Sequence, residues 1–310
     1  MALHRLLGLR TVVPDPAAVA GFYAELGLSG DAASGFTGSD GGAAVHLDEG
    51  PFRRPVAVQL GCDDERDLDV IADRLTEAGA SVQRDADAVR VVEPATRVEF
   101  TVRVAEPFVP AERIEPIVPN APGQSPRLDR RAPAVFGGPR APRRLGHLVL
   151  ASPAITDTRD FLVDGLGLKV SDELPGLIAF LRCSTDHHNI ALVDAPVPLL
   201  QHYSWECDDV DHVGHSATAL LRADPERHAW GLGRHFAGSN YYWYLRDPSG
   251  AFLELYSDMD QIVDDDDWES TGRTPFEFEH IANSWGPEIP LEFIVPSDLD
   301  ALQEAWAVQS

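Results

Sequence analysis

The stretch from Leu145 to Asp258 decides how this chain folds, through three short runs: LGHLVL (residues 145–150), LQHYSWE (residues 200–206) and LELYS (residues 253–257). Each run reads as a short apolar, alternating β-strand. Each also carries one side chain that can bind a cation, namely His147, His202 or Glu254. A glutamate between two leucines is costly to bury unless it is paired or bound to a metal. The three runs therefore predict neighbouring strands that share a polar site.

The chain also repeats itself. GCDD at residues 61–64 has a counterpart in ECDD at residues 206–209, and FYAELGL at residues 22–28 has one in FLVDGLGL at residues 161–168. Internal similarity of this kind indicates a duplicated domain. Within each half, a strand, a helix and further strands occur twice, which predicts four βαβββ units: residues 4–47, 55–104, 144–194 and 201–257. We predict an α+β protein of two tandem domains, each of two βαβββ modules curving around a central cleft.

The predicted boundaries follow from composition. Residues 1–106 form the first domain, residues 107–143 form a linker rich in proline and arginine, and residues 144–310 form the second domain with a C-terminal tail. The tail is apolar enough to pack on the second domain, through four side chains: Phe276, Phe278, Trp285 and Leu291.

The overall charge limits the possible partners. The chain of 310 residues has a formal net charge of −25, which repels nucleic acid and anionic membrane surfaces. It has only three cysteines and no CxxC motif, so we expect free thiols in a reducing cytoplasm. We find no signal peptide and no apolar stretch long enough to span a bilayer.

The three polar side chains have the composition of a known type of metal site. Two histidines and one carboxylate form a facial triad, which holds non-haem Fe(II) and leaves positions open for substrate and O2; Mn(II) accepts the same ligands. The repeat aligns His147 with Gly8 and His202 with Ala57, and Glu254 with Phe100, or with Glu99 if one gap is allowed. The first domain is therefore predicted to be metal-free and the second to be catalytic.

Residues 145–258 strongly resemble the type I extradiol catechol dioxygenases of the vicinal oxygen chelate superfamily. Six segments carry the resemblance: GHLV (146–149), DHHNIAL (186–192), QHY (201–203), GRH (233–235), YLRDPSG (244–250) and LELY (253–256). The resemblance implies the vicinal oxygen chelate fold, with His147, His202 and Glu254 as the iron ligands. It implies ring opening of a catechol by O2 in the catabolism of aromatic hydrocarbons, without an organic cofactor, in a protein that forms homo-oligomers.

The resemblance also assigns three residues around the metal. His188 stands at the position of the family's second-sphere histidine, which stabilises bound oxygen and transfers protons. His235 and Tyr244 stand at the positions that hydrogen-bond the substrate oxygens and assist their deprotonation. Histidine suits both acid and base roles because its pKa lies near neutrality.

One departure from the family bears on the substrate. Members that accept catechols with an acidic side chain carry an arginine where this chain has Trp230, and Val149 replaces an asparagine found in some of them. Tryptophan offers apolar area and a stacking face but no charge. We therefore expect an uncharged catechol with an alkyl, aryl or no substituent, although Arg234, Arg246 or a tail residue could still bind a carboxylate.

Two other function classes compete with this interpretation. Metal-dependent isomerases, lyases and antibiotic-resistance proteins use similar ligands on the same scaffold, usually with both halves or two chains completing the site. A non-catalytic binding protein could also retain the scaffold, and loss of a triad residue would favour it. All three triad residues lie in one half here, together with His188, His235 and Tyr244, which favours the dioxygenase.

Overall fold

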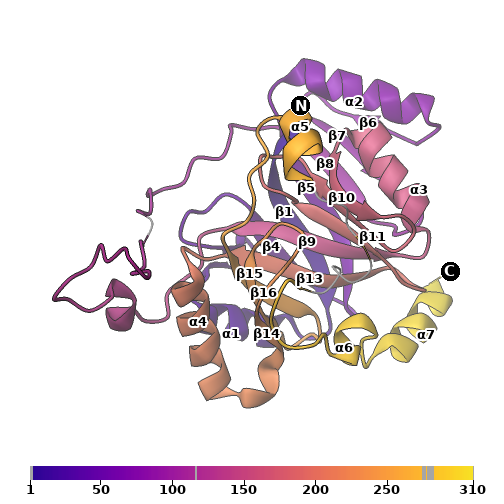
Figure 1. Cartoon of the computed structure of the whole chain (residues 1–310). Helices are drawn as coiled ribbons and strands as arrows, with labels where there is room; N and C mark the ends of the chain where they lie inside the picture. The colour runs from indigo at the N-terminus through magenta and orange to yellow at the C-terminus, as the bar shows by residue number, and fades with distance from the viewer. Residues whose placement is uncertain (1–2, 116, 274–276, 278–282, 310) are drawn as a thin grey trace.

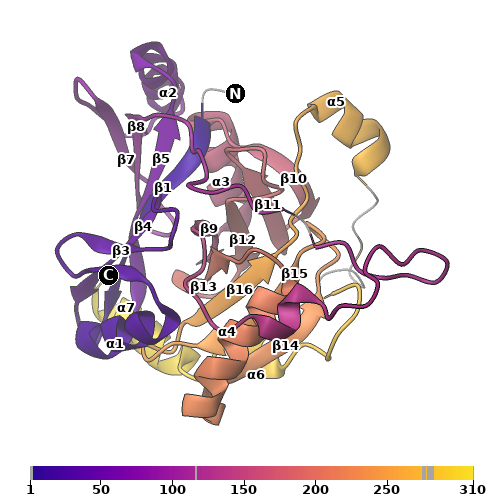
Figure 2. The same cartoon turned by 90° about the vertical axis from the view of Figure 1, so that its left-hand side faces the viewer.

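The computed structural model describes residues 3–115, 117–273, 277 and 283–309. It contains two eight-stranded sheets (Figures 1 and 2). The strand order is β2-β3-β4-β1-β5-β8-β7-β6 in the first sheet and β10-β11-β12-β9-β13-β16-β15-β14 in the second. The two orders are the same once the strands are renumbered, so the predicted α+β fold of two tandem domains with paired βαβββ modules is confirmed.

The elements of the first domain are β1 (Leu3–Val13), α1 (Pro16–Leu26), β2 (Ser29–Asp31), β3 (Gly35–Thr37), β4 (Ala44–Glu49), β5 (Arg54–Cys62), α2 (Glu65–Glu77), β6 (Gln83–Arg84), β7 (Ala88–Val92) and β8 (Glu99–Val104). Those of the second are β9 (Leu145–Ser152), α3 (Ile155–Asp160), η2 (Phe161–Leu166), β10 (Lys169–Leu174), β11 (Ile178–Arg182), β12 (Ile190–Asp194), β13 (Leu199–Glu206), α4 (Val210–Ala223), η3 (Pro225–Arg227), β14 (His228–Arg234), β15 (Tyr241–Arg246) and β16 (Phe252–Ser257). The linker contains η1 (Pro133–Phe136), and the tail contains α5 (Asp265–Asp267), η4 (Trp268–Gly272), α6 (Leu291–Ile294) and α7 (Leu299–Gln309). Within the described part of the chain, none of these helices has the length and apolar character needed to cross a bilayer.

The repeated Cys-Asp-Asp motif has a structural explanation. Cys62 is the last residue of β5 and Cys207 directly follows β13, and in each case the second aspartate caps the helix that follows. The side chain of Asp64 accepts hydrogen bonds from the backbone of Arg66 and Asp67 at the start of α2, and that of Asp209 accepts one from His212 at the start of α4. Aspartate is favoured at this position because it satisfies backbone N–H groups that the helix leaves unpaired.

The two domains share one apolar core, because helices of one half pack against elements of the other. Helix α1 contacts α4, and α2 contacts η2. Tyr23 of α1 lies edge-on to Tyr203 of β13, with 6.1 Å between ring centroids, and Phe100 of β8 lies 6.5 Å from Phe161. A single cluster of buried side chains therefore runs through both halves.

The linker extends away from the two sheets (Figures 1 and 2), whereas the tail packs against both domains. The segment between β8 and β9 extends away from the two sheets in both views (Figures 1 and 2). The tail returns to both domains: Phe293 packs on Phe252 and Tyr244 of the second sheet, whereas Leu302 and Trp306 of α7 pack with Phe52 of the first domain. Of the four side chains predicted to pack, Trp285 is 48% and Leu291 75% exposed, and Phe276 and Phe278 lie outside the described residues.

Candidate metal centre

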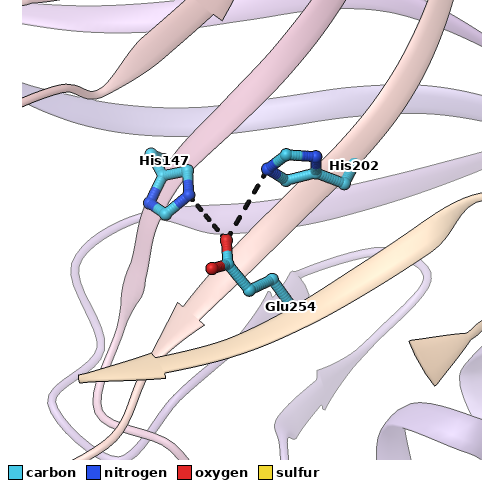
Figure 3. Close-up of side chains that lie close together, drawn as sticks. All are labelled: His147, His202 and Glu254. Carbon is cyan, nitrogen blue, oxygen red and sulfur yellow. Dashed lines mark hydrogen bonds and ion pairs between the residues drawn. The ribbon is translucent and has the colours of Figure 1, made fainter. Parts of the chain in front are cut away.

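The side chains of His147, His202 and Glu254 meet at the middle of the second sheet, on the adjacent strands β9, β13 and β16 (Figure 3). His147 Nε2 lies 2.8 Å and His202 Nε2 lies 3.6 Å from the same oxygen, Oε2 of Glu254. One donor atom from each residue lies within 4.8 Å of the other two, and all three residues are buried. This is the only group of three potential metal ligands found among the described residues.

Strand register explains why two of these side chains meet. His147 pairs with Ser204, and Ser204 pairs with Glu254, so the three residues form one row across the sheet. A β-bulge at Gln201, between Leu200 and His202, interrupts this pattern on β13. Bulges re-aim side chains. Here the side-chain oxygen Oε1 of Gln201 accepts a hydrogen bond from His202 Nδ1, which leaves His202 Nε2 toward Glu254.

The corresponding row of the first sheet corrects one expected alignment. Gly8 pairs with Gln59, and Gln59 pairs with Thr101, so Thr101 occupies the place of Glu254. The alignment of Glu254 with Phe100 or Glu99 was wrong. Glu99-Phe100 resembles Glu254-Leu255 in sequence, but the strand pairing places Thr101, two residues after Glu99, at the position of Glu254. The alignment of His147 with Gly8 agrees with the register.

The carboxylate of Glu254 is held by two further side chains that the sequence did not reveal as partners. Ser204 Oγ donates to Oε2 at 2.6 Å, and Asn240 Nδ2 donates to Oε1 at 3.1 Å. His235 Nε2 also lies 3.6 Å from Oε1. Such partners orient a ligating carboxylate. Asn240 sits just before β15, a position that strand alternation does not flag.

The electrostatics fit a divalent cation. Burial lowers the pKa of His202 to about 3, so its imidazole is neutral at physiological pH. Burial acts to raise the pKa of Glu254, but its contacts with His147, His235 and His202 outweigh burial and hold that pKa well below the usual range. Two imidazoles and one carboxylate fit Fe(II) or Mn(II), which accept mixed nitrogen and oxygen ligands.

The three residues lie at a cavity of about 470 Å³. Its wall is mostly apolar, with Val149, Phe180 and Leu199 among its side chains. His188, His235, Trp230 and Tyr244, all singled out from the sequence, also line it. The tail contributes Phe293, whose backbone oxygen accepts a hydrogen bond from Gln201 Nε2 at 3.0 Å. A mostly apolar cavity with a few convergent polar groups is typical of a small-molecule site.

His235 and Tyr244 act as a pair. His235 Nε2 lies 2.8 Å from the Tyr244 hydroxyl. Burial, followed by the charge of Glu254, raises the pKa of Tyr244 well above its ordinary value, so the phenol keeps its proton. Trp230 stacks on the Tyr244 ring with 5.5 Å between centroids and donates its indole N–H to the Pro287 carbonyl at 2.9 Å. Trp230 therefore forms a neutral wall behind this pair.

Comparisons with known proteins agree with this geometry. Residues 144–255 match the model of the Glyoxalase/Bleomycin resistance protein/Dioxygenase superfamily. A stretch of 155 residues is 37% identical to metapyrocatechase 2 of Cupriavidus necator, and it covers 49% of this chain but only 47% of that relative. The predicted resemblance to extradiol dioxygenases is thus confirmed, while the chain spans about half the length of the curated relative it matches.

Solved structures extend the likeness to both domains of the chain. The Mn(II)-bound glyoxalase of Novosphingobium aromaticivorans matches with a TM-score of 0.72 and 26% identity, over 94% of this chain and 93% of that one. The 3,4-dihydroxyphenylacetate complex of homoprotocatechuate 2,3-dioxygenase from Brevibacterium fuscum matches with a TM-score of 0.72 and 19% identity, over 94% of this chain and 92% of that one. At that identity the second match supports the fold alone.

Proposed function

We propose that this protein cleaves the ring of a catechol by an extradiol reaction with O2, using Fe(II) or Mn(II) held by His147, His202 and Glu254. The observation that carries the proposal is the convergence of these three buried side chains at an apolar cavity that also contains His188, His235 and Tyr244. The likeness to metapyrocatechase 2 supports the reaction class. The Mn(II)-bound glyoxalase supports manganese as an alternative to iron.

The roles of the residues follow from their chemistry. A bound divalent ion would lower the pKa of the catechol hydroxyls and hold catechol and O2 next to each other. His188 accepts a proton from a substrate hydroxyl and later returns it. Tyr244, which keeps its proton, donates a hydrogen bond to a substrate oxygen, and His235 orients the Tyr244 hydroxyl from 2.8 Å. The apolar wall keeps water from the reacting atoms.

An assay tests the proposed reaction directly. The purified protein is loaded with Fe(II) without oxygen, mixed with catechol, and exposed to air. Ring fission predicts consumption of O2 and a yellow product. Binding of catechol without O2 uptake would instead support a non-catalytic binding protein, and turnover of a substrate without O2 would support an isomerase or lyase of the same fold.

We also propose an uncharged substrate. Among the described residues that line the cavity there is no lysine or arginine, and Asp194 contributes a negative charge. Arg234 pairs with Asp258 at 2.7 Å and Arg246 pairs with Glu292, and neither lines the cavity. An unpaired carboxylate among these side chains would lose its hydration without a compensating cation.

The expected result is a preference for 3-methylcatechol over 3,4-dihydroxyphenylacetate. We expect kcat/KM to differ by at least about tenfold, because a difference of roughly 1.4 kcal/mol in binding is sufficient and burying an unpaired charge costs more than that. Steady-state O2 uptake with both compounds, and with catechol as the unsubstituted reference, measures the ratio. Faster turnover of the acid would contradict the proposal.

We also propose that the protein forms a homo-oligomer and that it is located in the cytoplasm. The linker carries Leu128, Val135 and Phe136 with 66%, 60% and 77% of their surfaces exposed, and a second copy could cover them. The three cysteines are free and buried, which suits a reducing compartment. Light scattering of the full chain tests the first point, and a monomer at micromolar concentration would contradict it.

A further inference from the structure

A row of three buried polar side chains leads away from the candidate metal centre behind the cavity wall. His188, which lines the cavity, has its Nδ1 atom 3.1 Å from Nδ1 of His187. Nε2 of His187 lies 3.0 Å from Oδ2 of Asp172 on β10. The exposed fractions are 4% for His188, 0% for His187 and 5% for Asp172, so water does not compete for these contacts. The proposed reaction itself uses neither Asp172 nor His187.

The contacts determine where the protons lie. A carboxylate only accepts hydrogen bonds, so Nε2 of His187 carries a proton and donates it to Asp172. A neutral imidazole has one N–H, so Nδ1 of His187 is then an acceptor. The 3.1 Å contact between the two Nδ1 atoms therefore requires the proton to reside on Nδ1 of His188. Nε2 of His188 is left without a proton, as the nitrogen available to the cavity.

This assignment applies to His187 as a neutral imidazole. The ring is fully buried and contacts Phe180 and Trp268, with centroid distances of 5.8 and 5.6 Å. The carboxylate of Asp172 already has a cationic neighbour, since Arg273 Nε lies 3.6 Å from its other oxygen. Asp172 therefore does not need an imidazolium to balance its charge.

We propose that Asp172 and His187 are positioning residues that hold His188 in the tautomer with its proton on Nδ1 and present its bare Nε2 to the cavity. The use of that nitrogen rests on the proposed function: a catechol hydroxyl that must lose a proton needs an acceptor in place before the reaction begins. The arrangement has the logic of a carboxylate that fixes a catalytic histidine in one tautomer, with one more histidine between the two.

The test replaces Asp172 with asparagine, which keeps its shape. Because Arg273 lies beside the other oxygen of Asp172, the asparagine oxygen is expected to stay toward Arg273 and its NH2 group to donate to Nε2 of His187. This moves the His187 proton to Nδ1 and the His188 proton to Nε2. Long-range proton–nitrogen NMR of the protein, after chelation of paramagnetic metal, is expected to show His188 as the Nδ1–H tautomer in the wild type and as the Nε2–H tautomer in D172N.

In the iron-loaded enzyme, kcat of D172N is expected to fall at least about tenfold, because a positioned proton acceptor contributes about 10²–10⁴-fold. KM is expected to change less than about twofold. Asp172 does not line the cavity, so its replacement removes no contact with the bound substrate.

Two further variants keep the test decisive. Glu173→Gln is the matched control, because the neighbouring Glu173 pairs with Arg159 at the surface and is expected to leave the His188 tautomer and kcat unchanged. If D172N does not fold, His187→Phe removes the Nδ1 acceptor while filling the same aromatic site, and the same loss of kcat is expected. A wild-type His188 with its proton on Nε2, or an unchanged tautomer in D172N, overturns the inference. If the wild type cleaved no catechol, the proposed function would be wrong but the tautomer assignment would not, because the NMR measurement does not depend on turnover.

Discussion

Glu254→Gln is expected to remove most of the metal from the protein and almost all of its activity. The substitution keeps the size of the side chain but replaces a carboxylate ligand, in contact with both histidines, by a neutral amide. Loss of an outer partner alone costs roughly 10–100-fold in metal affinity or activity, and loss of a ligand costs more. We therefore expect less than about a tenth of the wild-type metal content. Metal analysis after gel filtration and O2 uptake with added Fe(II) measure the two effects.

The first domain provides a matched control for this variant. Glu99 lies at the start of β8, the strand that takes the place of β16 in the first sheet, and no group of potential metal ligands includes it among the described residues. Glu99→Gln is expected to retain the wild-type metal content and kcat. A Glu254→Gln protein that kept both would show that the metal, if any, binds elsewhere.

Arg144→Met is expected to lower the free energy of unfolding by about 3 kcal/mol, because breaking a buried ion pair costs about 3–5 kcal/mol. Arg144 Nη2 lies 3.0 Å from Asp186 Oδ1, and its Nε binds Glu206. We place the effect at the lower end because Asp186 keeps hydrogen bonds from Ser184 and Gln261. Urea unfolding at neutral pH measures the difference from the wild type.

The pH dependence gives this prediction a second signature. Burial acts to raise the pKa of Asp186, but Arg144 outweighs it and holds that pKa below the usual range. A carboxyl group whose pKa is lower in the folded than in the unfolded protein stabilises the fold. This stabilisation is fully present above the pKa in the unfolded protein, about 4, and is lost as the pH falls through the pKa in the folded protein. The difference between wild type and Arg144→Met should therefore shrink below about pH 4.

Arg246→Met is the control for Arg144→Met, because it also removes one arginine charge but breaks only a partly exposed ion pair. Arg246 pairs with the partly exposed Glu292, and such pairs contribute about 0–1 kcal/mol. An Arg144 variant no less stable than this control would contradict a structural role for the buried pair.

The donors of the candidate site could be predicted because each lies in a strand whose alternation is visible in the sequence. The four modules were predictable for a related reason, since strand ends and helix caps recur with the Cys-Asp-Asp motif. These signals are local. They depend on side-chain period and capping chemistry within a few residues.

The remaining parts depend on contacts between distant segments. The bulge at Gln201 is a backbone irregularity, and the pairing of Thr101 with Gln59 is a matter of register between strands. Phe293 reaches the cavity from the tail, and Asp172 reaches His187 from a strand fifteen residues away. No periodic pattern in one stretch reports such contacts, so only the folded structure reveals them.

The interlocked helices limit how this polypeptide can be divided. A fragment cut at the linker would retain every metal donor, yet Tyr203 and Phe161 would lose the aromatic neighbours that α1 and β8 supply. The severed half would expose apolar surface normally covered by its twin, which favours aggregation. We therefore do not expect the half that contains His147, His202 and Glu254 to fold by itself, because the first domain covers part of its apolar surface.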